Sequence, residues 1–345
     1  MKNYNVGILG ATGAVGREML NSLMERNFPV GELRLLASKR SVGKKIKFNG
    51  KDIEVVEAKI GAFKGLDIVL GAASNDIAKE FKDDIVASGA VFIDNSSAFR
   101  LDENVPLVVP EINGEDVFKN HGVISNPNCS TIITLMALKA IGKLSEIKTV
   151  VASTYQAVSG IGVNGPIELM DEMGVMNDMY EKSGEPVIDI NATPKHFPYQ
   201  IAGNCIPFIG SVTENGYTKE EMKMQNEGRK IMHLPNLRVT CTCVRVPVVR
   251  SHMISVSVYT KDKLSLDQVR NAIKNDEGVV LYDDAANGIY PMPIKTSNQD
   301  KVFIGRIRED LAFDNGIALV CSGDQVRKGA AVNAVQIAIK LIERL

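Results

Sequence analysis

The stretch GILGATGAVGRE, residues 7–18, decides the fold of the N-terminal part of this 345-residue chain. It follows an apolar segment and leads into a helical pattern, with Gly10, Gly13 and Gly16 spaced three residues apart. Glycines at a strand-to-helix turn let the backbone approach a pyrophosphate, which then binds at the helix N-terminus. The spacing differs from the usual G-x-G-x-x-G, and a tight turn without a ligand would also use these glycines. The stretch favours a dinucleotide-binding unit.

The end of the next apolar segment indicates which dinucleotide this unit would bind. NAD-binding units usually place an Asp or Glu there for the ribose hydroxyl. Here LRLLAS (33–38) is followed by Lys39, Arg40 and Ser41, without an acid in the turn. A cation with hydroxyl groups suits a 2′-phosphate, so the sequence favours NADP. A solvated basic turn is the alternative.

Two patterns of secondary structure divide the chain. Up to residue 128, short apolar segments such as AVFID (90–94) and PLVVPEI (106–112) alternate with helical ones. This alternation predicts a parallel sheet with helices on both faces. Residues 129–324 carry longer alternating strands, such as HMISVSVYT (252–260), which predict a mixed α+β domain. In the tail, a helical face is formed by Val332, Val335, Ile339 and Ile342.

Composition narrows the class of protein. Forty basic and 41 acidic residues leave a net charge of −1, which indicates neither nucleic-acid nor anionic-membrane binding. No stretch approaches the roughly 18 consecutive apolar residues of a membrane span, and the N-terminus is broken by glycine too early for a signal peptide. Five cysteines, an odd number in a long chain, favour a reducing cytoplasm over a disulfide framework. We expect a cytoplasmic protein of enzyme size.

One cysteine lies at an unusual place. In NPNCST (126–131), Cys129 stands between a turn and the apolar helical run that follows. A helix N-terminus can lower a cysteine pKa from about 8.5 to roughly 3.5–7.5, and its amides can stabilise an oxyanion. Asn128 adds a side-chain donor. The sequence alone leaves a nucleophile and a structural cysteine equally open.

The remaining cysteines are interpreted as structural. Cys241 and Cys243 point to one strand face and lack further ligands at metal-binding spacing, so no metal site is expected. Cys205 and Cys321 lie in apolar sequence surroundings and are expected to be buried.

Several charged residues are candidates for a site. Alternation places His252 on the buried face of its strand and Arg245 on the apolar face shared with Cys241 and Cys243. A buried arginine needs an anion, either a partner carboxylate or a substrate carboxylate.

Thr218 and Glu221 have capping-box spacing. This spacing predicts a helix, and Glu220 and Lys223 would lie on one face of it. They would form either part of a site or a surface ion pair. Arg100 ends FIDNSSAFR (92–100), where a solvated loop arginine is the alternative.

Together the motifs resemble those of the aspartate-semialdehyde dehydrogenase family. The matching stretches span nearly the whole chain in the family's order: GATGAVGREML, DNSSAFR, VVPEIN, NPNCST, TYQAVSG, CVRVPVVRSH and GDQVRKGAAVNAVQIA. The resemblance implies NADP-dependent reductive dephosphorylation of L-aspartyl 4-phosphate to L-aspartate 4-semialdehyde. This step supplies the biosynthesis of lysine through diaminopimelate, and of threonine, isoleucine and methionine.

The resemblance also implies roles for individual residues. Cys129 would form an acyl-thioester, His252 would act as acid/base and Gln156 would position the substrate. Arg245 would bind the substrate α-carboxylate and Glu220 its ammonium group. The phosphate-binding residues would be Arg100, Lys223 and Asn128. Those that bind NADP would be Gly10, Ala11, Thr12, Gly13, Ala14, Val15, Gly16, Lys39, Arg40, Ser41, Ser159, Gly160 and Gln325.

The implied architecture is α/β, with a Rossmann-like NADP-binding domain (1–128 with 325–345) and a mixed α+β catalytic and dimerisation domain (129–324). A homodimer or homotetramer is expected. SGIG replaces the family's frequent SGAG, so Ile161 alters the shape expected at the nicotinamide side. Two alternatives are another acyl-phosphate reductase, such as N-acetylglutamyl-phosphate reductase, and a non-catalytic NADP-binding protein. Glu220 argues against the first, and the retained set of site residues argues against the second.

Overall fold

The structure, a computed structural model, describes residues 2–191 and 193–344 and contains two compact units. Unit 1 consists of the described residues of Met1–Ile132, Asn226–Pro235 and Val326–Leu345. Unit 2 consists of those of Ile133–Gln225 and Asn236–Gln325. Residues 226–235 thus belong structurally to unit 1, although they lie inside the segment expected to form the second domain. The functional domain boundaries stay a prediction.

Unit 1 contains a seven-stranded sheet of order β3-β4-β2-β1-β5-β6-β7. The neighbouring strands are parallel, as predicted, except that β3 is antiparallel to β4. The strands are β1 (Tyr4–Leu9), β2 (Val30–Ala37), β3 (Lys45–Phe48), β4 (Lys51–Glu57), β5 (Ile68–Gly71), β6 (Val91–Asp94) and β7 (Val123–Ser125).

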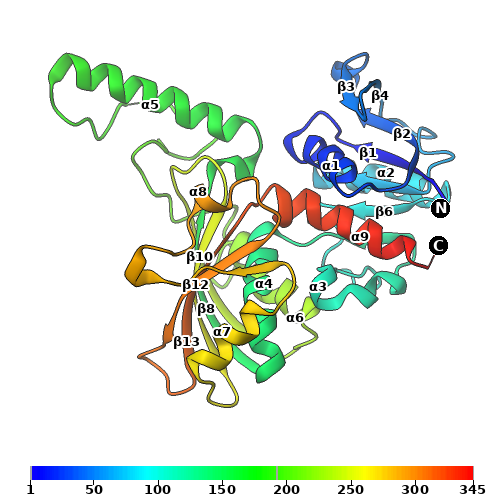
Figure 1. Ribbon diagram of the computed structural model, residues 1–345. Coiled ribbons are helices and arrows are strands. Elements are labelled where there is room, and N and C mark those ends of the chain that lie inside the picture. Colours follow the sequence, from blue (N-terminus) through cyan, green and yellow to red (C-terminus); the bar gives the residue numbers. More distant parts are fainter. Residues whose placement is uncertain (1, 192, 345) are drawn as a thin grey trace. The chain divides into compact units, whose positions relative to one another are not determined.

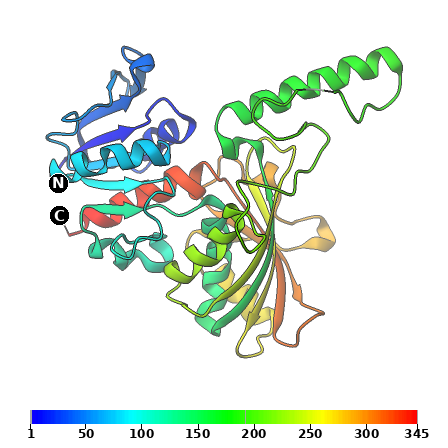
Figure 2. The same ribbon diagram turned by 180° about the vertical axis from the view of Figure 1, so that it is seen from behind.

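Helices cover both faces of this sheet, as Figures 1 and 2 show from opposite sides. On one face, α1 (Ala14–Glu25) and α9 (Val332–Ile342) pack with Ile8 and its neighbours in one apolar core. On the other, α2 (Asn75–Ala87) packs with Leu9 and its neighbours in a second core. Consecutive strand residues therefore serve opposite cores, because side chains alternate across a strand. The apolar tail predicted to be helical forms α9 and completes the first core.

One local prediction for unit 1 failed, and one hairpin was not predicted. Residues 106–112 were expected to form a strand, but Leu107 makes only an isolated bridge to Ser125, and α3 (Pro110–Asn113) begins at Pro110. Proline donates no ladder hydrogen bond and is favoured at the first position of a helix. The short helix η2 (Gly114–Lys119) follows. The β3–β4 hairpin was not predicted, although Asn49 and Gly50, both at positive φ, form a typical hairpin turn.

Unit 2 contains a six-stranded sheet of order β11-β12-β13-β10-β8-β9. Parallel and antiparallel pairs both occur, which confirms the predicted mixed α+β type. Its strands are β8 (Ile147–Gln156), β9 (Arg238–Arg245), β10 (His252–Thr260), β11 (Val279–Leu281), β12 (Val302–Glu309) and β13 (Gly316–Gly323). Two of the helices that accompany them are α4 (Cys129–Leu144) and α7 (Leu266–Lys274), and α8 (Pro293–Thr296) and η4 (Ala285–Asn287) lie in the connections.

The connection from β8 to β9 carries α5 (Asn164–Ser183) and α6 (Lys219–Ile231), separated by a long irregular segment. Two buried glutamates of α5 hold this segment. Glu168 accepts the backbone N–H groups of Lys195 and His196, and Glu172 accepts those of Ile201 and Ala202. In α6, the predicted capping box is present between Thr218 and Glu221.

Within residues 2–191 and 193–344, no helix has both the length and the apolar character needed to cross a membrane.

Candidate active-site residues

The glycine-rich loop of unit 1 has the geometry that a bound pyrophosphate needs. Gly10 has φ +88°, and a Cβ on Gly16 would clash with the carbonyl oxygen of Gly10. Gly13 is the N-cap of α1 without a side-chain cap, and Ala14, Val15 and Gly16 form the first turn. The compact loop brings the backbone of residues 10–16, including Ala11 and Thr12, to the helix N-terminus. The backbone of this loop and the N-terminus of α1 together suit the anionic pyrophosphate of a dinucleotide.

The basic turn lies directly after β2. Lys39, Arg40 and Ser41 form the short helix η1, in which both cations are exposed and the serine is buried. In a parallel sheet of this type, the end of the second strand faces the ribose of a dinucleotide. The exposed cations are therefore available to a 2′-phosphate.

Cys129 is the first residue of α4 and is half-buried. Asn128 precedes it and caps the helix, because its Oδ1 accepts the N–H groups of Ser130 (3.1 Å) and Thr131 (3.2 Å). The side-chain amide oxygen of Asn128 is thus used as a helix cap, and the predicted side-chain donor is the Nδ2 group of the same amide. The thiol lies at the N-terminal, positive end of a 16-residue helix.

Arg100 is buried in unit 1, so the alternative of a solvated loop arginine was wrong. Its Nε donates to the carbonyl oxygen of Asn126 (2.9 Å) and its Nη2 to that of Asn95 (2.9 Å). Its Nη1 forms an ion pair with Glu227 Oε1 at 3.0 Å. The guanidinium is therefore held from three sides.

In unit 2, Arg245 and His252 bind the same residue, Ala157. Arg245 Nη1 donates to the Ala157 carbonyl oxygen (2.7 Å), and the Ala157 N–H donates to His252 Nδ1 (3.0 Å). Because Nδ1 accepts a hydrogen bond, the neutral imidazole carries its proton on Nε2. A Cβ on Gly160 would lie 2.7 Å from Arg245 Nη1 and 3.3 Å from His252 Cε1, so glycine is needed for this close approach.

The imidazole of His252 is fully buried, as strand alternation predicted. Burial, and next the charge of Arg245, lower the pKa of His252 from 6.5 to about 3, against a smaller opposite effect of Glu220. The ring is therefore neutral at physiological pH. A bound anion that neutralised Arg245 would raise this pKa.

Glu220 links two further predicted residues of unit 2. Its Oε2 forms an ion pair with Lys223 at 2.8 Å, and its Oε1 accepts Gln156 Nε2 at 3.3 Å. The Glu220 side chain is 10% exposed and that of Lys223 is 28% exposed, so this is not an ordinary surface pair. Gln156, at the end of β8, is itself buried.

Two of the predicted cofactor-binding residues, Gln325 and Ser159, are hydrogen-bonded to each other in unit 2. Gln325 Nε2 donates to Ser159 Oγ (2.5 Å), and Gln325 Oε1 accepts the backbone N–H of Ser251 (2.8 Å). Ser251 directly precedes His252 in the sequence. Ser159, Gly160 and Ile161 belong to η3 (Val158–Ile161), and the Ile161 side chain is exposed.

Unit 1 thus brings together Arg100, Asn128 and Cys129, and unit 2 brings together the candidates on β8, β9, β10 and α6. Sequence reasoning missed Glu227, which pairs with Arg100. A signal existed, because Glu227 lies seven residues after Glu220 in α6, close to two helical turns.

The other cysteines lie apart from these groups. The Cys241 and Cys243 sulfurs are buried 3.8 Å apart, and the hydrogen bond between them is the largest of the effects that raise the Cys241 pKa. Burial raises the pKa of Cys321 to about 12. Cys205 is exposed, contrary to expectation, although the neighbouring Ile206 is buried in an apolar core. Across the described ranges 2–191 and 193–344, no group of three or more histidine, cysteine or acidic residues could hold a metal ion.

Comparison with known proteins shows the family to which the chain belongs. Residues 5–120 match the family of semialdehyde dehydrogenase NAD-binding domains, and residues 138–328 match the family of semialdehyde dehydrogenase dimerisation domains. The chain is 48% identical to aspartate-semialdehyde dehydrogenase of Aquifex aeolicus, over 99% of this chain and 98% of the relative. Identity to the Bacillus subtilis enzyme is 44%, over 99% and 98%.

A crystal structure of aspartate-semialdehyde dehydrogenase II from Vibrio cholerae, complexed with ASA, is similar with a TM-score of 0.94. Its sequence identity is 41%, and the match covers 100% of this chain and 99% of that one. The chain combines a nicotinamide dinucleotide-binding domain with a domain of the dimerising type, so it is an oxidoreductase of the semialdehyde dehydrogenase class. It belongs to the aspartate-semialdehyde dehydrogenase family.

Proposed function

We propose that the protein catalyses the NADPH-dependent reductive dephosphorylation of L-aspartyl 4-phosphate to L-aspartate 4-semialdehyde, through an acyl-thioester on Cys129. The product would supply the biosynthesis of lysine and diaminopimelate, threonine, isoleucine and methionine. The observation that carries this proposal is the position of Cys129 at the capped start of α4, in a chain of this family. A helix N-terminus favours the thiolate, which is the nucleophilic form.

The other residues have complementary roles in this proposal. Arg245 binds the α-carboxylate through its planar guanidinium, and Glu220 binds the ammonium group. Gln156 positions the substrate. Arg100, Lys223 and Asn128 bind the phosphoryl group. The cofactor binds through residues 10–16, Lys39–Ser41, Ser159, Gly160 and Gln325.

The reaction follows from these roles. The Cys129 thiolate attacks the acyl carbon, a C–S bond forms, and the C–O bond to phosphate breaks with its electron pair leaving on phosphate. Arg100 and Lys223 stabilise the charge of the departing phosphate. NADPH, when bound, supplies the hydride that reduces the thioester carbon. When the substrate carboxylate neutralises Arg245, the pKa of His252 rises and the ring can take up a proton from solvent. The protonated His252 gives the proton on Nε2 to the oxygen of the thiohemiacetal and recovers it when the C–S bond breaks, which releases the aldehyde and the thiolate.

An assay of the reverse reaction tests this proposal. We expect NADPH to form from L-aspartate 4-semialdehyde and NADP only when inorganic phosphate is present. N-acetylglutamate semialdehyde should not support it, because an acetylated nitrogen carries no positive charge for Glu220. Preference for that substrate would contradict the proposal, and so would the absence of NADPH with either one.

We also propose a cytoplasmic location and a homodimer or homotetramer. No disulfide joins the cysteines in the part of the chain that the structure describes, and this suits a reducing compartment. The dimerisation-domain match supports self-association.

Replacing Lys39 and Arg40 together by alanine should weaken NADP binding much more than NAD binding. Both side chains are exposed in the turn after β2, where the 2′-phosphate of NADP would lie. Dissociation constants for both cofactors, measured by calorimetry, check this. The matched variant Lys44→Ala, an exposed cation beyond the turn, should change neither constant. An equal loss for both cofactors would refute the assignment of the 2′-phosphate site.

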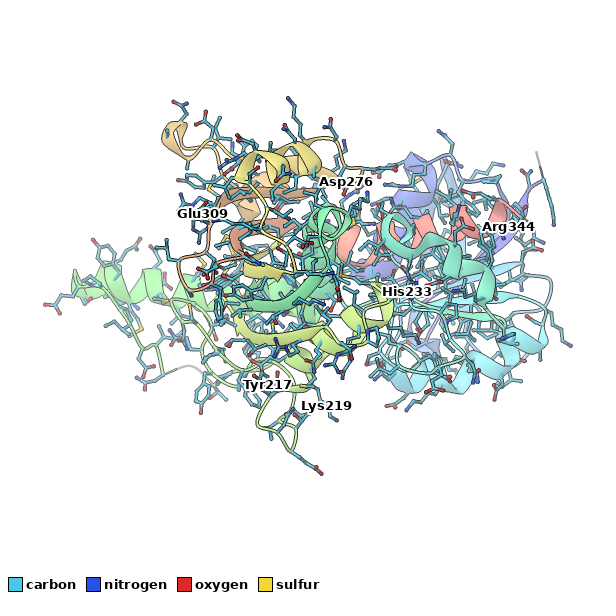
Figure 3. All side chains as sticks on the ribbon, turned by 90° about the horizontal axis from the view of Figure 1, so that it is seen from below. Tyr217, Lys219, His233, Asp276, Glu309 and Arg344 are labelled. Carbon is cyan, nitrogen blue, oxygen red and sulfur yellow. The ribbon has the colours of Figure 1, made fainter. Side chains whose placement is uncertain are left out.

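The Lys223→Ala variant should raise the Michaelis constant for phosphate in the oxidative direction. The constant for semialdehyde should not rise, because the change removes a cation from Glu220, the proposed ammonium ligand. Steady-state kinetics with each substrate varied in turn measures both constants. Lys219→Ala, an exposed lysine at the start of the same helix (Figure 3), is the matched control. A rise confined to the semialdehyde constant would place Lys223 in a different subsite.

A further inference from the structure

Glu227 in α6 joins two of the proposed active-site residues of unit 1. Its side chain is 2% exposed. One carboxylate oxygen, Oε1, accepts Arg100 Nη1 at 3.0 Å, and the other, Oε2, accepts the backbone N–H of Asn128 at 2.7 Å. A single buried carboxylate thus bridges the proposed phosphate-binding arginine and the residue before the proposed nucleophile.

The bond to Asn128 completes the cap of α4. In a capping box, a glutamate in the first turn accepts the backbone N–H of the N-cap residue. Thr131 occupies that position here and has no carboxylate, and Glu227 accepts this N–H from another helix. Because Asn128 Oδ1 also caps Ser130 and Thr131, both its side chain and its backbone are held. The first turn of α4, which begins with Cys129, is therefore held in place.

The bond to Arg100 orients the guanidinium. A guanidinium has five N–H donors, and Glu227, Asn126 and Asn95 accept three of them. Lys230, one turn after Glu227 in α6, binds the main chain at Arg100 and in the residues that follow it. Its Nζ donates to the carbonyl oxygens of Arg100, Asp102 and Val105. The same helix thus holds both the backbone and the charged group of Arg100.

We propose that Glu227 is a positioning residue for the reaction, which holds the Arg100 guanidinium and the Cys129-bearing turn in one fixed geometry. This inference rests on the proposed function, in which Arg100 binds the phosphoryl group and Cys129 attacks the carbon that carries it. The guanidinium and the sulfur must be aligned at once, and a misplacement of about 1 Å can lower a rate by about 10²-fold. Glu227 acts through Arg100 and Asn128 rather than by touching the substrate.

The test compares Glu227→Gln and Glu227→Asp with the wild-type enzyme. An amide has one acceptor oxygen, so Gln can satisfy only one of the two donors. Asp keeps the charge but is one methylene shorter and cannot span both donors. We expect kcat to fall by about 10- to 100-fold in both variants. The Michaelis constant for semialdehyde should stay within about twofold, because its proposed ligands, Arg245 and Glu220, are unchanged. If the Gln variant does not fold, the Asp variant carries the comparison.

Glu111→Gln is the matched control. Glu111 is another glutamate of unit 1 whose side chain is buried, and its partners are Lys328, at 2.6 Å, and Gln336, rather than the residues that Glu227 bridges. Losing this ion pair should lower the thermal midpoint without lowering kcat at about 25 °C. If the Glu227 variants keep kcat within about twofold, or if Glu111→Gln loses as much kcat for an equal loss of thermal midpoint, the proposal is overturned.

A second measurement does not depend on activity. Hydrogen–deuterium exchange, followed by mass spectrometry on peptides that span residues 126–132, reports whether Glu227 holds this turn. We expect exchange to be at least about tenfold faster in Glu227→Ala, which removes both acceptor oxygens, than in the wild type or Glu111→Gln, because the hydrogen bond from the Asn128 N–H is lost. Unchanged exchange would overturn the proposal. If the wild type shows no phosphate-dependent reaction, the proposed function fails, and this exchange result still decides whether Glu227 positions the turn.

Discussion

Replacing Cys129 by serine is expected to abolish turnover in both directions while NADP binding stays intact. A hydroxyl has almost no anionic form near neutral pH, even at a helix N-terminus, so the acyl-enzyme cannot form. The substitution is nearly isosteric and keeps the hydrogen bonds by which Asn128 caps α4. A loss of activity would therefore report on chemistry rather than on folding.

The measurement has two parts. Activity and NADP affinity are compared for Cys129→Ser and for the control Cys205→Ser, which changes an exposed cysteine and should remain active. The wild type is then mixed with acyl phosphate without NADPH, and the modified peptide is identified by mass spectrometry. An acyl group on any residue other than Cys129 would end its assignment as the nucleophile.

The His252→Asn variant should lower kcat by roughly 10²–10⁴-fold, the usual range for a lost general acid/base. Asparagine can keep a hydrogen bond but cannot exchange a proton near neutrality. Semialdehyde binding should change little, because its proposed ligands remain. His233→Asn, which changes an exposed histidine (Figure 3), should retain wild-type turnover. Near-wild-type kcat in His252→Asn would remove this residue from the mechanism.

A pH experiment on the same variant tests the state of the buried ring. The pKa of His252 is about 3 in the folded protein and 6.5 in an unfolded reference, so only the unfolded chain takes up this proton between those values. Wild-type stability therefore falls as the pH decreases from 6.5 towards 3. The His252→Asn variant lacks this contribution, so its thermal midpoint should improve relative to that of the wild type on acidification. A constant difference between the two midpoints would show that His252 does not titrate in this way.

Local patterns predicted much of the fold and of the candidate site. The period of two along β10 and β9 placed His252 and Arg245 on buried faces correctly, because side-chain direction depends only on the neighbouring backbone. The capping box of Thr218 and Glu221 depends equally on close sequence spacing. The β3–β4 hairpin could have been predicted from Asn49 and Gly50, and the proline residues of 106–112 were a sign against a strand.

Contacts between distant residues could not be predicted in this way. Glu227 and Arg100 are 127 positions apart, and a helical spacing within α6 says nothing about which residue the carboxylate meets. For the same reason, the sharing of Ala157 by Arg245 and His252 was not predicted. Family resemblance supplied roles for Arg100, Arg245 and His252, but their hydrogen-bond partners required the structure.

The packing of α9 has a consequence for the order in which the protein can fold during synthesis. Residues of this helix, near the end of the sequence, form part of the apolar core that also contains α1 and β1. A nascent chain that has reached Ile132 has made all the strands of the unit 1 sheet but none of α9. At roughly 5–20 residues per second, roughly 10–40 s pass before the ribosome reaches this helix. Throughout that interval one face of the sheet lacks part of its apolar cover, and exposed apolar surface of this kind makes an incomplete chain prone to aggregate.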